Sequence, residues 1–183
     1  MNKERLVFID VETTGLDPAK GHRIIEIGAV AMENEQLVSE FQSLVHVSTP
    51  IPRHVSKIHG ITNAMLVGQP TPEKIYPEFK DFISDSLLIA HNAEFDVGFL
   101  RSEFSRLNLR IQNPSICTLK RSRRRYPRLP NYKLSTVYKH LVGTDGDMFR
   151  KPEGIGMCPQ IQQHRALDDA RMVAAIWMAM EVK

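Results

Sequence analysis

The sequence contains few cysteines, no long apolar run and no large excess of charge of either sign. Its two cysteines, Cys117 and Cys158, form no CxxC pair and have no histidine pair nearby at zinc spacing, which argues against structural zinc. No apolar run has the length of a signal-peptide core or of a membrane span. We therefore expect a cytoplasmic protein that does not enter the membrane.

The formal net charge of +3 at pH 7 is too small to indicate a polyanionic partner by itself. The segment 120–128, KRSRRRYPR, is nevertheless strongly basic, with six Lys and Arg residues. This segment could steer a phosphate chain, or it could be a solvated helix face. Taken alone, the composition favours the solvated face.

The 183 residues, 42% apolar and 25% charged, fit one domain spanning 1–183. Hydrophobic periodicity changes several times along the chain, as in a mixed α/β domain. Strands are expected at 6–10, at 24–32 and 37–47 as an antiparallel hairpin, and at 86–90. Helices are expected at 72–83, 94–107, 134–141 and 167–180. The stretch 143–163 is rich in Gly and Pro, and a functional loop and a hairpin insertion are equally open.

Two acids, Asp10 and Glu12, lie at the end of the first strand, in LVFIDVETTG. Alternation along a strand places both carboxylates on one side and Val11 on the other. Because adjacent like charges repel, the pair needs either solvent or a divalent cation between the side chains. Open α/β sheets bind ligands at the carboxyl ends of strands, where this pair lies. For an isolated DxE, a solvated strand end would be the simpler explanation.

Asp96 is a third acid, in the helix that follows the fourth strand. At 100° per residue it lies on the same side as Phe99, Leu100 and Phe104, so we expect it to face the sheet. A core-facing aspartate without a partner is costly, which favours a functional role. Glu103 falls on the same stripe and weakens the inference, although it lies two turns farther from the strand end.

The C-terminal helix contains a fourth acid on its buried face. Asp169 shares that face with Val173 and Trp177, whereas Asp168 points about 100° away and suits a first-turn carboxylate that stabilises the helix dipole. His164 lies five residues before Asp169, or about 140° around a continuous helix. We therefore place His164 in the loop before the helix, where it can approach the site.

Three segments, FIDVETTG, HNAEFDVGFL and HRALDDA, resemble in this order the exonuclease motifs of the DEDD superfamily, in its His-containing branch. IHGIT at 58–62 matches a further segment of that branch, which includes the proofreading epsilon subunit of bacterial DNA polymerase III and ribonuclease T. The resemblance covers nearly the whole chain. It implies that the four acids hold two divalent cations, Mg²⁺ or Mn²⁺, and that His164 is the general base; the acids are Asp10, Glu12, Asp96 and Asp169.

The resemblance also implies a ribonuclease H-like α/β fold, with a mixed five-stranded sheet and helices on both faces. The implied activity is hydrolysis of single-stranded nucleic acid, DNA favoured, from the 3′ end to nucleoside 5′-monophosphates, with a DNA polymerase as a candidate partner. Positions that match substrate contacts in relatives are Thr13, Thr14, Gly15, His59, His91 and Asn92. Each of them could equally be a local turn or hydrogen-bonding residue.

Other functions stay open. An RNA-processing 3′→5′ exoribonuclease of ribonuclease T type would use the same motifs, because discrimination depends on contacts around the 2′-hydroxyl. A ribonuclease H-type endonuclease fits less well, since the DxE and the histidine five residues before the last acid match the exonuclease pattern. A catalytically silent nucleic-acid-binding module would be expected to lack one or more of the five residues, and all five are present.

Overall fold

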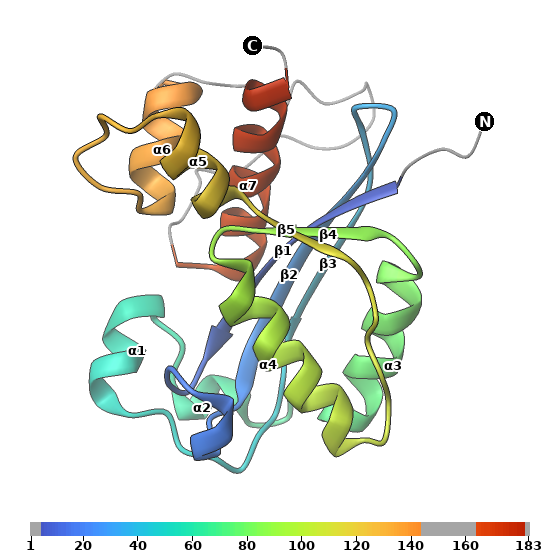
Figure 1. Cartoon of the computed structure of the whole chain (residues 1–183). Coiled ribbons are helices and arrows are strands. Elements are labelled where there is room, and N and C mark those ends of the chain that lie inside the picture. The colour runs from blue at the N-terminus through green and yellow to red at the C-terminus, as the bar shows by residue number, and fades with distance from the viewer. Residues whose placement is uncertain (1–4, 144–163, 182–183) are drawn as a thin grey trace.

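The computed structural model describes residues 5–143 and 164–181. Their five strands form one sheet in the order β3-β2-β1-β4-β5: β1 Arg5–Thr13, β2 Ile24–Glu33, β3 Gln36–Leu44, β4 Leu87–Ala90 and β5 Ser115–Cys117 (Figure 1). The pairs β1–β2 and β2–β3 are antiparallel, whereas β1–β4 and β4–β5 are parallel. The predicted mixed five-stranded sheet is therefore confirmed.

The helices of the described residues include all four that the sequence predicts, with bounds that differ by about one residue. They are α1 Arg53–His59, α2 Asn63–Leu66, α3 Pro72–Ile83, α4 Ala93–Arg106, α5 Thr118–Arg125, α6 Leu134–Leu141 and α7 Ala166–Glu181. None of them, within the described ranges, is long and apolar enough to cross a membrane. Periodicity did not predict α1, α2 and α5. Helices α1 and α2 are too short to show a clear hydrophobic period, and α5 has a single large apolar residue, Leu119.

Strand β1 is longer than predicted and includes both of its acids. Asp10 pairs with Gly28 and Glu12 pairs with Glu26, because β2 continues the antiparallel ladder past the apolar run. The expected end near Asp10 is therefore wrong. Pairing on β2 fixes the direction of both carboxylates more firmly than a free strand end would.

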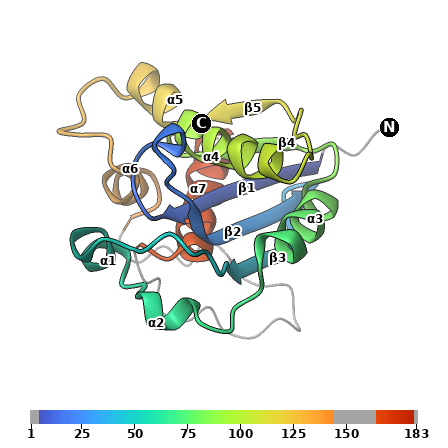
Figure 2. The same cartoon turned by 90° about the horizontal axis from the view of Figure 1, so that it is seen from below.

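The sheet is covered on both faces, as predicted. On one face, Val7 and Ile9 of β1 pack with residues of α3 and α4, including Phe79 and Phe99. On the other face, Phe8 belongs to a separate cluster formed with α7 (Figures 1 and 2). Asp10 and Glu12 alternate in step with Phe8, so they point to the α7 side. Helices α5 and α6 lie at one end of this α/β sandwich and α1 and α2 at the other (Figure 1).

Helix α7 approaches β2 closely at Gly28. A Cβ atom at this position would overlap the backbone of Ala166 and Leu167, in the first turn of α7. Any side chain at this position would therefore push the start of the helix away from the sheet. The absence of a side chain at Gly28 sets the height of α7 above β1 and β2.

We predict that Gly28→Ala lowers the free energy of unfolding by about 1–3 kcal/mol, because the added methyl group overpacks a backbone contact. The measurement is denaturant unfolding followed by circular dichroism. Gly98→Ala in α4 is the matched control, since a Cβ there meets no atom within 4 Å, and it should leave stability unchanged or raise it by about 0.5–1 kcal/mol. If the two variants were equally stable, the close approach of α7 to β2 at Gly28 would be contradicted.

Candidate active site

The sheet topology brings the four predicted acids together from three segments. Asp10 and Glu12 come from β1, and Asp96 lies in the first turn of α4, directly after the parallel neighbour β4. Asp169 lies in the first turn of α7, which packs on β1 and β2. Because the carboxyl ends of parallel strands meet at one edge of a sheet, these acids share that edge.

The carboxylates of β1 are held in a charge-repelling environment. Burial, and then repulsion by Asp96 and Asp169, raise the pKa of Asp10 well above its ordinary value. Burial, followed by Asp169 and Glu26, raises the pKa of Glu12 to about 8. Among the described residues neither acid forms an ion pair with Lys or Arg, and the positive charge of Arg165 only partly opposes the rise in the pKa of Glu12.

The two helix acids are buried in the same environment. Asp96 is 3% exposed and Asp169 is 8% exposed, as the helical periodicity predicted. Burial raises the pKa of Asp96 to about 8, although hydrogen bonds from its own backbone and from the backbone of Val11 act to lower it. Burial raises the pKa of Asp169 to about 6, against the opposing effect of His164. The neighbouring Asp168 instead accepts a hydrogen bond from Arg171 Nη1 at 2.9 Å.

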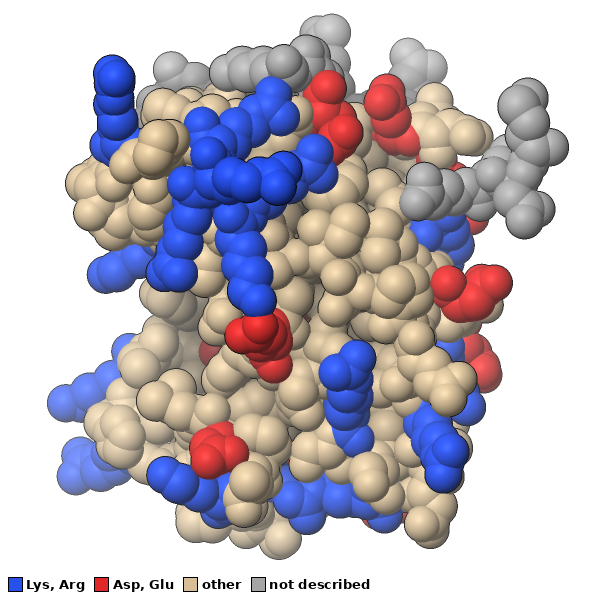
Figure 3. Space-filling model, viewed as in Figure 1, with Lys and Arg blue, Asp and Glu red and all other residues tan. Residues whose placement is uncertain are grey.

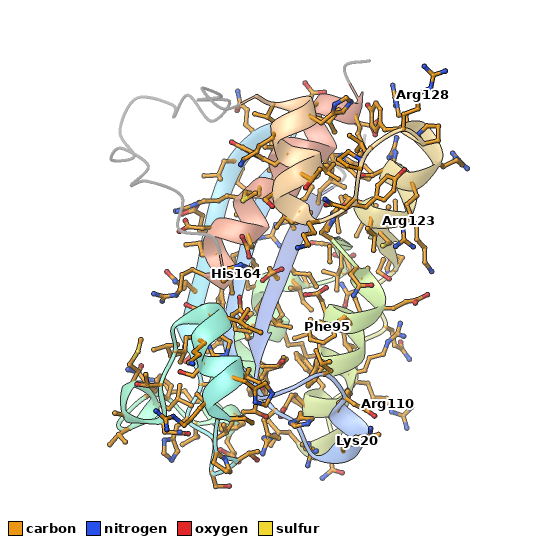
Figure 4. All side chains as sticks on the ribbon, turned by 90° about the vertical axis from the view of Figure 1, so that its left-hand side faces the viewer. Lys20, Phe95, Arg110, Arg123, Arg128 and His164 are labelled. Atoms are coloured by element: carbon orange, nitrogen blue, oxygen red, sulfur yellow. The ribbon has the colours of Figure 1, made fainter. Side chains whose placement is uncertain are left out.

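His164 precedes α7, as predicted, in a left-handed backbone conformation with φ 65°. Its backbone N–H donates to Asp169 Oδ2 at 3.2 Å. The side chain is exposed, and one ligand atom each from Glu12, His164 and Asp169 lie within 4.8 Å of one another. In Figure 4 His164 lies between α7 and α1. The imidazole therefore opens to solvent directly beside two of the carboxylates.

Glu26 of β2 is a further acid at this site, which the sequence prediction missed. It is fully buried, and Arg165 binds it through Nη2 to Oε1 at 2.8 Å and through Nε to both oxygens at 3.2 Å. The backbone N–H of Ala166 also donates to Glu26 Oε2 at 3.1 Å. Glu26 thus fixes the two residues that follow His164. A glutamate inside the apolar run IIEIGAVAM was the available sequence signal.

Glu103, the other acid on the buried stripe of α4, has a different role. Its carboxylate accepts from Arg23 Nε at 2.7 Å and Nη2 at 2.8 Å, and from the backbone N–H of Ile24 at 3.2 Å. It lies 1% exposed at the far end of α4 from Asp96. This ion pair ties α4 to the start of β2, so Glu103 is a packing contact outside the acid cluster.

The turn after β1 uses most of its predicted substrate groups internally. Thr13 Oγ1 donates to the Gly15 carbonyl at 2.6 Å, and Thr14 Oγ1 accepts from the backbone N–H of Arg23 at 3.0 Å. A Cβ at Gly15 would overlap the imidazole ring of His22. The hydroxyls of Thr13 and Thr14 therefore shape this turn, and the backbone N–H of Thr14 also donates to the Arg23 carbonyl at 2.9 Å.

The three remaining candidates, His59, His91 and Asn92, differ in how far their polar groups are already engaged in hydrogen bonds. His59 is buried, its Nδ1 accepts from the N–H of Ile61 at 3.0 Å, and its Nε2 has no partner among the described residues. His91 has both ring nitrogens engaged, by Thr118 Oγ1 at 2.9 Å and by the Tyr132 carbonyl at 2.8 Å. Asn92 is exposed and adopts φ 85° at the N-cap of α4. His91 is thus a bridge between segments, and His59 retains one free polar atom.

Comparison with known proteins decides the family. A family model described as Exonuclease, RNase_T, matches residues 7–177. The chain belongs to this exonuclease family. The exonuclease is 36% identical over 174 residues to the DNA polymerase III subunit epsilon of Aquifex aeolicus, covering 94% of this chain and 78% of that protein. It is also 36% identical over 173 residues to a PolC-type DNA polymerase III of Clostridium perfringens, 94% of this chain but 11% of the polymerase.

Solved structures agree with this family assignment. Exonuclease X in complex with 5′ overhanging duplex DNA matches at a TM-score of 0.73 and 28% identity, covering 97% of this exonuclease and 92% of that chain. Escherichia coli exonuclease I in complex with a dA16 oligonucleotide matches at a TM-score of 0.79 and 17% identity, covering 99% of this exonuclease and 41% of that chain. This second match supports the fold. The predicted ribonuclease H-like fold is therefore confirmed, and exonucleases of this family use divalent metals.

We predict that the metal-free exonuclease loses stability as the pH rises from about 5 to about 8. The folded protein holds protons on Glu12 and Asp96, whose pKa values are about 8, where the unfolded chain has released them. The folded protein is therefore most stable below the ordinary pKa values of Glu and Asp. This stability is lost as the pH rises to the folded-state pKa values of Glu12 and Asp96. In chelator the melting temperature should fall by roughly 5 °C or more across this range.

Added Mg²⁺ or Mn²⁺ should restore the melting temperature at pH 8, because a cation neutralises the ionised cluster. Glu12→Gln is the control, and this variant should show a weaker response to both pH and metal. A wild-type melting temperature that rises with pH in chelator would contradict the charge repulsion at the site.

Proposed function

We propose that this chain is a metal-dependent 3′→5′ exonuclease that hydrolyses single-stranded nucleic acid, with DNA favoured, to nucleoside 5′-monophosphates. The observation that carries the proposal is the meeting of four acids that no Lys or Arg neutralises among the described residues; they are Asp10, Glu12, Asp96 and Asp169. Membership of the exonuclease family supports it.

The donor set suits two divalent cations of the Mg²⁺ or Mn²⁺ type. All four acids offer hard carboxylate oxygens, which these ions prefer. Burial and mutual repulsion raise the pKa of each acid, so a bound cation would stabilise the ionised forms. When bound, such cations would neutralise charge on the attacking and leaving oxygens of a phosphodiester.

His164 is proposed as the general base. Its exposed imidazole lies beside Glu12 and Asp169, where it can take the proton of the attacking water. The backbone N–H bond to Asp169 and the anchoring of Arg165 by Glu26 hold the chain on both sides of the base. A loop histidine is thereby kept in a fixed place without burying its ring.

Substrate contacts are proposed at the rim of the acid cluster. His59 Nε2 is a buried polar atom without a described partner, and its charge interactions include His164 and Glu26, so it lies close to the site. A sugar hydroxyl or phosphate oxygen would satisfy it. The other candidate contacts are the exposed Asn92 and the turn formed by Thr13, Thr14 and Gly15.

The remaining assignments follow from the relatives. We propose a single exonuclease domain over 1–183, acting in the cytoplasm on 3′ ends, with a DNA polymerase as a candidate partner. DNA is favoured because the relatives above include DNA polymerase III epsilon and an exonuclease bound to DNA. An RNA-processing activity of ribonuclease T type is the alternative outcome.

Cleavage of 5′-labelled single-stranded DNA and RNA, side by side, tests the proposal. With Mg²⁺ or Mn²⁺ we expect a descending ladder of labelled products, faster on DNA, and with chelator no products. Faster cleavage of RNA would assign the RNA-processing alternative. Internal cuts would indicate an endonuclease, and intact strands in every metal would support a silent binding module.

Asp169→Asn should lower kcat by at least about a hundredfold, because it removes a carboxylate from the acid cluster. Its melting temperature in chelator should equal or exceed that of the wild type, since the substitution removes a buried, repelled charge. Asp168→Asn is the matched control and should keep near wild-type kcat, because Asp168 pairs with Arg171 at the helix surface. The reverse ranking of the two variants would overturn the assignment.

A further inference from the structure

Helix α5 carries a concentrated positive surface that the proposed chemistry does not use. Lys and Arg occupy six of the nine positions in 120–128, although the whole chain has a net charge of only +3. Figure 3 shows Lys and Arg side chains gathered over α5 on this face. Such a local excess attracts polyanions at a distance and raises their local concentration.

Several of these cations fasten α5 to its neighbours. Arg121 pairs with Glu181 at 2.6 Å and lies over the Trp177 ring at 4.6 Å. Arg125 Nη1 donates to the Met180 carbonyl at 2.8 Å. These contacts fix α5 against the C-terminal end of α7, so the remaining side chains project from a rigid support.

Arg124 and Arg128 make none of these contacts, whereas Arg123 lies over the Tyr132 ring at 5.7 Å. Both are exposed, and neither has an acidic partner among the described residues. Arg124 lies in the last turn of α5, where a cation also favours the helix dipole, but Arg128 lies beyond the helix end. Stabilisation of α5 therefore does not explain the whole cluster.

The other end of α5 is tied to the segment that leads from β4 into α4. Thr118, its first residue, hydrogen-bonds His91, which directly follows β4. Lys120 forms an ion pair with the exposed Glu94, which lies on the outer side of the first turn of α4, about 200° around the helix from the buried Asp96. Figure 4 shows Arg123 and Arg128 at one edge of the molecule and His164 nearer its centre. The positive surface thus begins at the first turn of α4, the turn that also contains Asp96, and continues away from it.

We propose that α5 binds the phosphates of the substrate strand on the 5′ side of the nucleotide being removed, through Arg124 and Arg128. The inference rests on the proposed exonuclease function. Eight helical residues span about 12 Å, which matches roughly three phosphates of a stacked strand. Phosphate contacts of this kind position a strand without reading its sequence, as removal of successive nucleotides requires.

The test compares Arg124→Ala/Arg128→Ala with Lys74→Ala/Lys80→Ala, which removes the same charge from exposed positions on α3. Binding of 5′-labelled strands is measured by fluorescence anisotropy in chelator, so it does not depend on cleavage. Raising the salt from about 50 to about 200 mM should weaken wild-type binding about sevenfold more than binding by the α5 variant, at a slope near 0.7 per phosphate. The α3 variant should match the wild type.

Kinetics separate this surface from the acid cluster. With a strand of about 20 nucleotides at low salt, the α5 variant should show a KM raised by roughly tenfold or less and an unchanged kcat. With a trinucleotide, which offers only two phosphates, the rise in KM should be smaller and kcat should again be unchanged. Unchanged binding of the long strand would overturn the α5 proposal while leaving the exonuclease function standing. A kcat lost on the trinucleotide would also overturn it, by placing the arginines in the reaction centre.

Discussion

The contact between the start of α7 and β2 is the constraint on which the site depends. Glu26 binds the Arg165 side chain and the Ala166 N–H, and Gly28 lets the helix backbone lie against the strand. A buried ion pair adds little net stability, because desolvation offsets its attraction. Its effect here is positional, since it fixes the turn on which His164 and Asp169 stand. Without it, two segments whose contacting residues, Glu26 and Arg165, are 139 residues apart in sequence would have no fixed register.

The fold must also hold four repelling carboxylates close together. Hydrophobic clusters on both faces of the sheet supply the stabilisation, with Phe8 and Trp177 on one side and Phe79 and Phe104 on the other. Pairing of Asp10 and Glu12 across to β2 keeps the acids from turning toward solvent. The site is therefore preorganised at a cost in stability, which a bound cation would offset.

Much of this arrangement could be predicted from local patterns. Alternation along β1 placed Asp10 and Glu12 on one side of the strand, and the helical period of α7 correctly separated the buried Asp169 from Asp168. The length of β1 could not be predicted, since it depends on β2 continuing the ladder past the apolar run. Strand β5 has three residues and no readable period, and the family resemblance alone implied it. Expectations for 144–163 lie outside the described residues.

Asp96 and Glu103 show what a sequence pattern leaves undecided. Both are buried acids on one face of α4, and periodicity treats them alike. The structure separates them by their partners, because Arg23 comes from a segment 80 residues away and neutralises Glu103, while Asp96 meets other carboxylates. Glu26 follows the same rule through Arg165. A buried acid with its own arginine stabilises packing, whereas a group of acids that shares no arginine calls for a cation from outside the chain.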